Sequence, residues 1–245
     1  MNNYNIIIQY EGTRYNGWQK QGNTPNTIQE KFENILYKMT EKRVEINASG
    51  RTDAGVHAKG QCANFKCDTD MSDEEVLKYI NHYLPEDIRV LEIEKAPERF
   101  HARLSAKAKT YEYKISASKK PDVFKRRTVY AIENELDIEL MKKASEKLLG
   151  EHDFVGFSSL KKVKKSTVRN ISSIEIKEDD DVIKFTITGN GFLYNMVRIV
   201  VGTLVEIGAG ERDIKSIDEI FESKQRVNAG ITMPAKGLTL LEVLY

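Results

Sequence analysis

A carboxylate flanked by two glycines is the feature of the sequence best suited to chemistry. Asp53 lies in the segment ASGRTDAGVH, between Gly50 and Gly55 and two residues after Arg51. Glycine permits positive φ and close approach of another backbone, so this loop can present the Asp53 carboxylate to a ligand. The spacing also fits an Asx turn, in which Asp53 only hydrogen-bonds its own backbone. Spacing alone leaves both interpretations open.

A tyrosine pair and an arginine in apolar surroundings are the next candidates. Tyr111 and Tyr113 alternate in a predicted strand, so both rings lie on one face, either as a stacking platform or as part of the core. Arg198 lies in an otherwise apolar predicted helix. A buried arginine needs a partner, which the sequence does not identify.

The elements that position these residues alternate between strand and helix. β-Branched runs predict strands, apolar residues at helical spacing predict helices, and Ser72 with Glu75 forms a capping box. In the first half the predicted strands are Tyr4–Tyr10, Val44–Asn47, Gln61–Phe65 and Asp87–Glu94, and the predicted helices are Thr27–Lys38 and Ser72–Leu84. In the second half the strands are Thr110–Ser116, Ile171–Lys177, Val182–Gly189 and Leu238–Leu244, and the helices are Ile138–Leu149 and Phe192–Gly208.

This order predicts an α+β protein built from two ferredoxin-like halves. The first half, residues 1–105, carries the Asp53 loop, and the second half comprises residues 106–245. Trp18 lies in the long loop after the first strand, where it either lines a binding groove or packs that loop onto the sheet. His57 and His152 lack metal-ligand spacing and are expected to be structural.

Composition indicates a globular protein of the cytosol. The chain has 245 residues, 40% hydrophobic and 31% charged, which excludes disorder as its main theme. The longest apolar stretch, Met196–Val205, contains Arg198 and is too short to cross a bilayer. No export signal opens the sequence, and Cys62 and Cys67 are expected to be reduced thiols.

The positive charge is clustered although the net charge is only +1. Arg99–Arg127 holds ten basic residues against two acidic ones, and Lys161–Arg169 holds five basic residues and no acid. Clustered cations attract a polyphosphate backbone, whereas the alternative is a solvated lysine-rich surface. The clusters alone leave both interpretations open, a nucleic-acid partner and a solvated surface.

Several motifs in order along the chain resemble the tRNA pseudouridine synthase A family. The longest is GRTDAGVHA at residues 50–58. The others are GT at 12–13, YNGWQKQ at 15–21, FHARLSA at 100–106, TYEY at 110–113, HDF at 152–154, FLYNMVR at 192–198 and PAKGL at 234–238. The resemblance covers essentially the whole chain, and so many motifs in one order are far more specific than a single glycine-rich match.

The resemblance implies a fold, a reaction and partners. The expected fold is that of the pseudouridine synthases, with a mainly antiparallel sheet shared by the two halves, flanking helices and a central RNA-binding cleft. The expected enzyme is a homodimer without metal or organic cofactor, which isomerises uridine to pseudouridine at positions 38, 39 and 40 of the tRNA anticodon stem-loop. The target nucleotide must leave the base stack to expose both reacting atoms.

Roles for single residues also follow from the resemblance. Asp53 is the expected catalytic carboxylate, acting as a nucleophile or moving a sugar proton, and the sequence does not choose between these mechanisms. Tyr111 is expected to pack on the flipped uracil, and Arg198 to pair with the catalytic carboxylate. The remaining expected RNA contacts are Arg51, which helps to extrude the base, and His101 and Arg103 on the RNA backbone.

Two residues depart from the family pattern, because Lys109 and Met233 stand where arginine and alanine are usual. Lysine keeps the positive charge of arginine but cannot bind a phosphate through two parallel hydrogen bonds. The two departures therefore bear on which nucleotides are modified and not on the reaction.

Two other classes of function compete with this interpretation. A sheet module that only binds RNA gains nothing from an anionic Asp53 beside its ligand. A carbohydrate hydrolase needs paired carboxylates, whereas the motifs present one carboxylate among cations.

Overall fold

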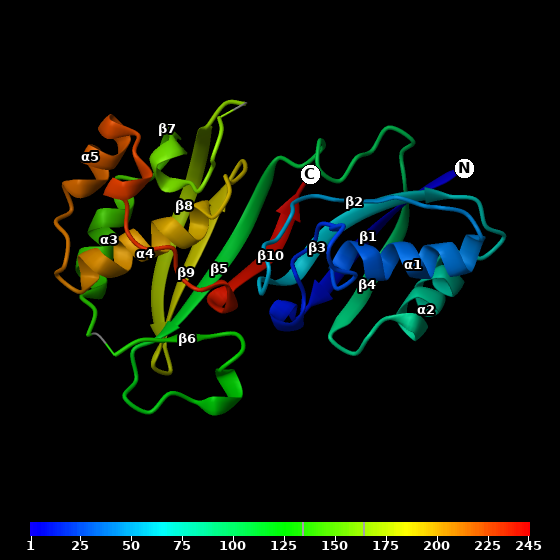
Figure 1. Ribbon diagram of the computed structural model, residues 1–245, viewed down its shortest axis with the longest axis horizontal. Coiled ribbons are helices and arrows are strands. Elements are labelled where there is room, and N and C mark those ends of the chain that lie inside the picture. Colours follow the sequence, from blue (N-terminus) through cyan, green and yellow to red (C-terminus); the bar gives the residue numbers. More distant parts are fainter. Residues whose placement is uncertain (134, 164) are drawn as a thin grey trace. The chain divides into compact units, whose positions relative to one another are not determined.

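The computed structural model describes residues 1–133, 135–163 and 165–245, and divides them into two compact units. Unit 1 comprises Met1–Lys107 and Leu240–Tyr245, and unit 2 comprises Ala108–Thr239 (Figure 1). The last strand, β10 (Leu238–Leu244), crosses this division. The segment Leu240–Tyr245, expected in the second half with residues 106–245, therefore belongs to the first unit.

Unit 1 follows the predicted order of strand, helix, two strands, helix and strand. Its elements are β1 (Asn2–Tyr10), α1 (Ile28–Thr40), β2 (Ile46–Ala48), β3 (His57–Cys67), α2 (Asp73–Tyr83) and β4 (Ile88–Ala96). The strands are ordered β4-β1-β3-β2 with antiparallel neighbours, and β10 lies beside β3. This is the ferredoxin-like arrangement that the sequence predicts.

Local sequence accounts for these elements. Alternate residues of β1, Tyr4, Ile6 and Ile8, are fully buried, as expected for a strand with one face on the core. Helix α1 begins where the Thr27 side chain accepts a hydrogen bond from the Glu30 N–H, and α2 begins at the predicted capping box of Ser72 and Glu75. Each cap satisfies backbone donors that the first turn of a helix leaves unpaired.

Unit 2 is also α+β, with four antiparallel strands in the order β5-β9-β8-β7 and a short strand β6 parallel to β5. Its elements are β5 (Ala108–Ser116), β6 (Tyr130–Ala131), α3 (Ile138–Glu146), β7 (Gly150–Asp153), β8 (Val168–Asp179), β9 (Val182–Gly189), α4 (Met196–Gly208) and α5 (Ser216–Ser223). The expected α+β class with mainly antiparallel pairing is confirmed.

The predicted start of α4 at Phe192 is wrong. The helix begins at Met196, because Asn195 has a φ of 61°, in the left-handed region. The ring of Phe192 instead packs edge-on against Tyr111, with 5.3 Å between centroids. The hairpin of β8 and β9 turns at Asp180 and Asp181, which both have positive φ.

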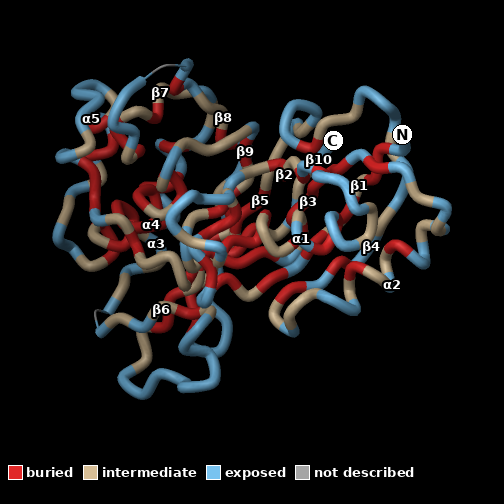
Figure 2. The backbone as a smooth tube through the Cα atoms, turned by 45° about the vertical axis from the view of Figure 1, so that its right-hand side comes forward, coloured by how far each residue is buried: buried red, intermediate tan, exposed pale blue. Residues whose placement is uncertain are grey.

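Burial follows the strands and α4, whereas the loop before β6 is exposed (Figure 2). Cys62 and Cys67 are free and buried, and burial raises the pKa of each thiol to about 11. Both are therefore thiols, as predicted. Across residues 1–133, 135–163 and 165–245, no helix combines the length and apolarity needed to span a membrane.

Candidate active site

The loop that carries Asp53 joins β2 to β3 in unit 1. A backbone hydrogen bond from the Val56 N–H to the Asp53 C=O, at 3.1 Å, closes the turn, and Gly55 adopts a φ of 79°. Asp53 is half-buried and Arg51 is exposed. The glycine loop thus holds Asp53 near the surface, two residues after the exposed Arg51.

A buried polar network fixes the residues that precede Asp53. The Tyr10 hydroxyl and Thr52 Oγ1 are 2.7 Å apart, Gln61 Nε2 donates to the Gly50 C=O at 2.9 Å, and Ser49 Oγ donates to Gln61 Oε1 at 2.7 Å. All four side chains are buried, and burial raises the pKa of Tyr10 to about 12, so this phenol stays neutral at physiological pH.

The sequence reasoning missed this network. Gln61 and Ser49 are fully buried, and their polarity made them resemble surface residues. The available signal was a glutamine inside a strand that is otherwise apolar at alternate positions. A buried polar side chain needs hydrogen-bonding partners, and here those partners are the neighbours of the candidate catalytic loop.

The first loop of the chain packs directly against the Asp53 loop. The Trp18 N–H donates to the Thr52 C=O at 3.0 Å, and Gly17 has a φ of 85°. A Cβ at position 17 would come within 2.7 Å of the Thr52 carbonyl oxygen, so only glycine allows this approach. Trp18 is 2% exposed and stacks on Phe32 with centroids 6.2 Å apart. Trp18 therefore packs its loop onto the core.

A second contact between the same loops involves His57. The Gly12 N–H donates to His57 Nδ1 at 2.9 Å, and a Cβ at position 12 would lie 2.0 Å from the Val56 carbonyl oxygen. His57 is buried and structural, as predicted. The loop of residues 12–18 and the loop of residues 50–57 are thus held together by hydrogen bonds and close backbone contacts next to Asp53.

Tyr111 and Tyr113 lie on β5 of unit 2, opposite Ile187 and Phe185 of β9. Tyr111 is 9% exposed and meets Phe192 edge-on. Tyr113 is fully buried, its hydroxyl donates to the Pro234 C=O at 2.6 Å, and burial raises its pKa. Tyr113 is therefore a core residue.

Arg198 lies in the first turn of α4, where two hydrogen bonds hold its guanidinium. Nε donates to the Met233 C=O at 2.5 Å, and Nη1 donates to Asn195 Oδ1 at 2.9 Å. Met233 accepts through its backbone, and its side chain is fully buried. Its departure from the family's usual alanine therefore leaves this contact with Arg198 intact.

The lysine-rich segment after Ser159 is tied to the same turn. Asn195 Nδ2 donates to Ser159 Oγ at 3.1 Å, and the Ser159 N–H donates to the Tyr194 C=O at 3.0 Å. Lys161, Lys162 and Lys165 of this segment are exposed, and Lys164 lies outside the described residues. The sequence reasoning did not single out Asn195, although asparagine tolerates the left-handed conformation better than most residues.

The remaining RNA-contact candidates lie together in unit 1. His101 Nδ1 accepts from the Arg103 N–H at 3.1 Å. His101 also lines a groove of about 730 Å³ whose charged lining side chains are the cations Arg43, Lys66 and Arg99 and the acids Glu45 and Glu98. Arg103 is exposed. In the part of the chain that the structure describes, no group of three or more His, Cys, Asp or Glu is arranged to hold a metal ion.

A sequence profile of the tRNA pseudouridine synthase family matches residues 6–104 and 144–245. The matched ranges contain Arg51, Asp53, His101, Arg103 and Arg198, whereas Tyr111 lies between them. The α+β fold and the glycine loop around a carboxylate agree with this class of isomerase. The chain belongs to the tRNA pseudouridine synthase family.

Curated relatives match over the full length. The chain is 45% identical over 245 residues to tRNA pseudouridine synthase A 2 of Bacillus cereus (strain ZK / E33L), covering 100% of both chains. It is 49% identical over 240 residues to tRNA pseudouridine synthase A of Bacillus sp. (strain KSM-64), covering 98% of each. It is 42% identical over 245 residues to tRNA pseudouridine synthase A of Acetivibrio thermocellus, covering 100% of both.

Proposed function

We propose that this protein isomerises uridine to pseudouridine in tRNA, at positions 38, 39 and 40 of the anticodon stem-loop. The observation that carries the proposal is full-length membership in the family, in a chain whose Asp53 lies on a rigid glycine loop. The protein is proposed to act in the cytoplasm as a homodimer, with tRNA as its substrate.

The reaction rearranges one nucleotide without adding or removing an atom. The bond between uracil N1 and ribose C1′ breaks, a bond between C5 and C1′ forms, and the hydrogen on C5 leaves as a proton while N1 gains one. Because C5 and C1′ are covered in a stacked helix, the nucleotide must be flipped out first. Asp53 acts either as the nucleophile or as the base that moves a sugar proton, and both roles require an ionised carboxylate.

The other site residues are proposed to support this carboxylate and the flipped base. Tyr111 packs on the uracil, because an aromatic face binds a base by stacking. Arg198 pairs with the Asp53 carboxylate and keeps it ionised, a role supported by the two hydrogen bonds that fix its guanidinium. Arg51, His101 and Arg103 contact the RNA, and for His101 the cations of its groove support this role.

Release of tritium from tRNA labelled at uracil C5 tests the proposal directly. The purified protein is incubated with a tRNA transcript, and label appearing in water is counted. Release by the wild-type protein is expected, because the C5 hydrogen leaves in the reaction. Binding without release would identify an RNA-binding module, and the absence of both binding and release would overturn the proposal.

A further inference from the structure

An exposed loop of unit 2 presents an aromatic side chain to solvent. The loop spans Ala117–Val129 and is closed at its base by strand pairing, with Ile115 opposite Tyr130 and Ser116 opposite Ala131. Val129 is buried and anchors its end. The whole loop lies between the two ranges that the family profile matches. The full-length relatives align across this stretch, although the profile does not match it.

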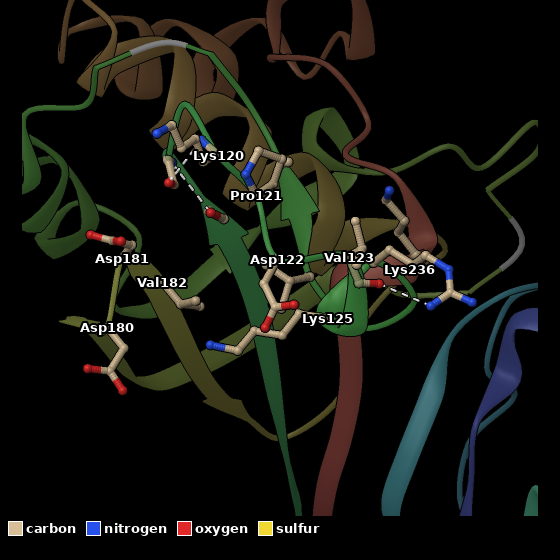
Figure 3. A pocket seen from close by; sticks show the side chains of 14 residues that line it. Lys120, Pro121, Asp122, Val123, Lys125, Asp180, Asp181, Val182 and Lys236 are labelled. Atoms are coloured by element: carbon tan, nitrogen blue, oxygen red, sulfur yellow. Dashed lines mark hydrogen bonds between the residues drawn. The ribbon is translucent and has the colours of Figure 1, made fainter.

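Hydrogen bonds within the loop give its tip a defined shape. Asp122 Oδ1 accepts from the Phe124 N–H at 2.8 Å, and the Lys125 N–H donates to the Asp122 C=O at 3.1 Å. Arg126 Nη1 donates to the Val123 C=O at 3.0 Å (Figure 3). These contacts build a short 3₁₀ turn, Val123–Lys125, that holds Phe124 in place.

Phe124 is 90% exposed at this tip. Its neighbours Val123, Lys125 and Arg126 line a cavity of about 350 Å³, together with Val182 of the next hairpin (Figure 3). Phe124 is not part of that lining and projects to solvent instead. The hydrogen-bonded turn keeps this ring in solvent, where it is available to stack on an aromatic face of a partner.

The charge around Phe124 selects the kind of partner. The exposed cations of the loop are Lys119, Lys120, Lys125, Arg126 and Arg127, against the single acid Asp122. Asp180 and Asp181 of the turn between β8 and β9 line the same cavity as Lys125 and Arg126. Two copies of such a loop meeting across a twofold axis would place cations against cations. A polyanion with exposed aromatic faces, which is an RNA with unpaired bases, fits both the charge and the ring.

We infer that the loop Ala117–Val129 is a tRNA contact in which Phe124 stacks on an unpaired base while the flanking cations hold the adjacent phosphates. The inference rests on the proposed function, since tRNA is the substrate there. The inference adds an RNA contact at residues 117–129, which lie between the two ranges that the family profile matches. Stacking tolerates any base, so this contact strengthens binding without reading sequence.

Tryptophan fluorescence tests the stacking itself. The single tryptophan, Trp18, is 2% exposed, so Phe124→Trp adds one solvent-exposed reporter. We expect a tRNA transcript to quench the added emission, and a fully paired RNA duplex at equal phosphate concentration to quench it much less. The wild-type protein, titrated in the same way, is the control for Trp18. Absence of quenching by bound tRNA would overturn the inference.

Steady-state tritium release measures the contribution of the ring. Phe124→Ala is expected to raise the KM for tRNA about tenfold and to leave kcat unchanged, whereas Phe124→Tyr retains the wild-type KM. Val227→Ala, at an 81% exposed apolar residue of the same unit, is the matched control. An unchanged KM in Phe124→Ala contradicts the inference. A wild-type protein that releases no tritium contradicts the proposed function instead, and the fluorescence result still decides the loop.

Sedimentation of the protein without RNA tests whether the partner of the loop is instead a second copy of this chain. If Phe124→Ala shifts the protein from a larger to a smaller species, the loop is an interface between copies of this chain and the RNA contact is wrong. An unchanged oligomeric state is expected.

Discussion

Asn195 holds Arg198 from one turn away, because Asn195 Oδ1 accepts from Arg198 Nη1 at 2.9 Å. The other end of the same amide donates to Ser159 at the root of the lysine-rich segment. The left-handed backbone at Asn195 aims its side chain back over the first turn of α4. One amide therefore connects Arg198, the proposed charge partner of the Asp53 carboxylate, to the lysine-rich segment that follows Ser159.

Asn195→Gly keeps the left-handed backbone, which glycine adopts freely, and removes both side-chain hydrogen bonds. Since a hydrogen bond to a charged group is worth about 1.5–3 kcal/mol, we expect kcat at saturating tRNA to fall about tenfold with little change in KM. Single-turnover tritium release measures this step. Ser159→Ala, which spares the bond to Arg198, is the matched control. Equal losses in both variants would show that Asn195 only holds the segment.

Asp53→Asn removes the proposed catalytic charge and keeps the size of the side chain. We expect isomerisation to be abolished and tRNA affinity to stay within about tenfold, or about 1.4 kcal/mol, because an anionic group does not itself bind phosphate. Filter binding and tritium release, compared on one preparation, check the two halves of this prediction. Turnover by the variant, with deamidation excluded by mass spectrometry, would remove Asp53 from the mechanism.

Neutralising Lys161, Lys162, Lys164 and Lys165 to glutamine tests the electrostatic part of binding. For each lysine that binds a phosphate of a duplex region, the substitution is expected to reduce the slope of log affinity against log salt by about 0.9. Binding should weaken similarly for different tRNAs, because lysines that bind phosphates do not read bases. Catalysis at saturating tRNA should survive better than affinity. An unchanged slope would show that this segment is solvated surface.

Tyr10→Phe probes the network below the Asp53 loop and has a pH signature. Burial raises the Tyr10 pKa from 10.0 to about 12, so the unfolded chain releases the phenolic proton at lower pH than the folded one. The stability linked to this group is therefore complete below pH 10 and is lost as the pH rises toward 12. The variant should lose about 1 kcal/mol at neutral pH and show a weaker decline between these pH values. Urea unfolding at several pH values measures both, and parallel curves would contradict the assignment.

Local signals predicted the elements whose causes are local. The capping box of Ser72 and Glu75 and the apolar spacing of α1 lie within a few residues, and both helices begin where they indicate. The start of α4 was misplaced because it depends on the backbone of Asn195 and on Phe192 packing against a distant strand. The short strands β6 and β7 were missed because pairing with β5 and β8 creates them.

The parts of the candidate site also differ in whether their cause is local in the sequence. Asp53 and its glycines were visible because a turn is encoded in consecutive residues. The network of Tyr10, Ser49 and Gln61 was not visible, because its members lie far apart in the sequence and their hydrogen bonds form only in the folded chain. Trp18 was undecided for the same reason, since its ring partners are Tyr10 and Phe32.

The crossing of β10 between the units has a consequence for synthesis. Unit 1 takes Leu240–Tyr245 beside β3, and the Tyr245 hydroxyl donates to the Ala102 C=O at 2.7 Å. While the ribosome is still making residues 108–239, the first unit lacks this strand, and the part of the β3 edge that does not pair with β2 stays unpaired. Open strand edges invite aggregation. The nascent chain therefore cannot complete its first unit until residues 240–245 have been added.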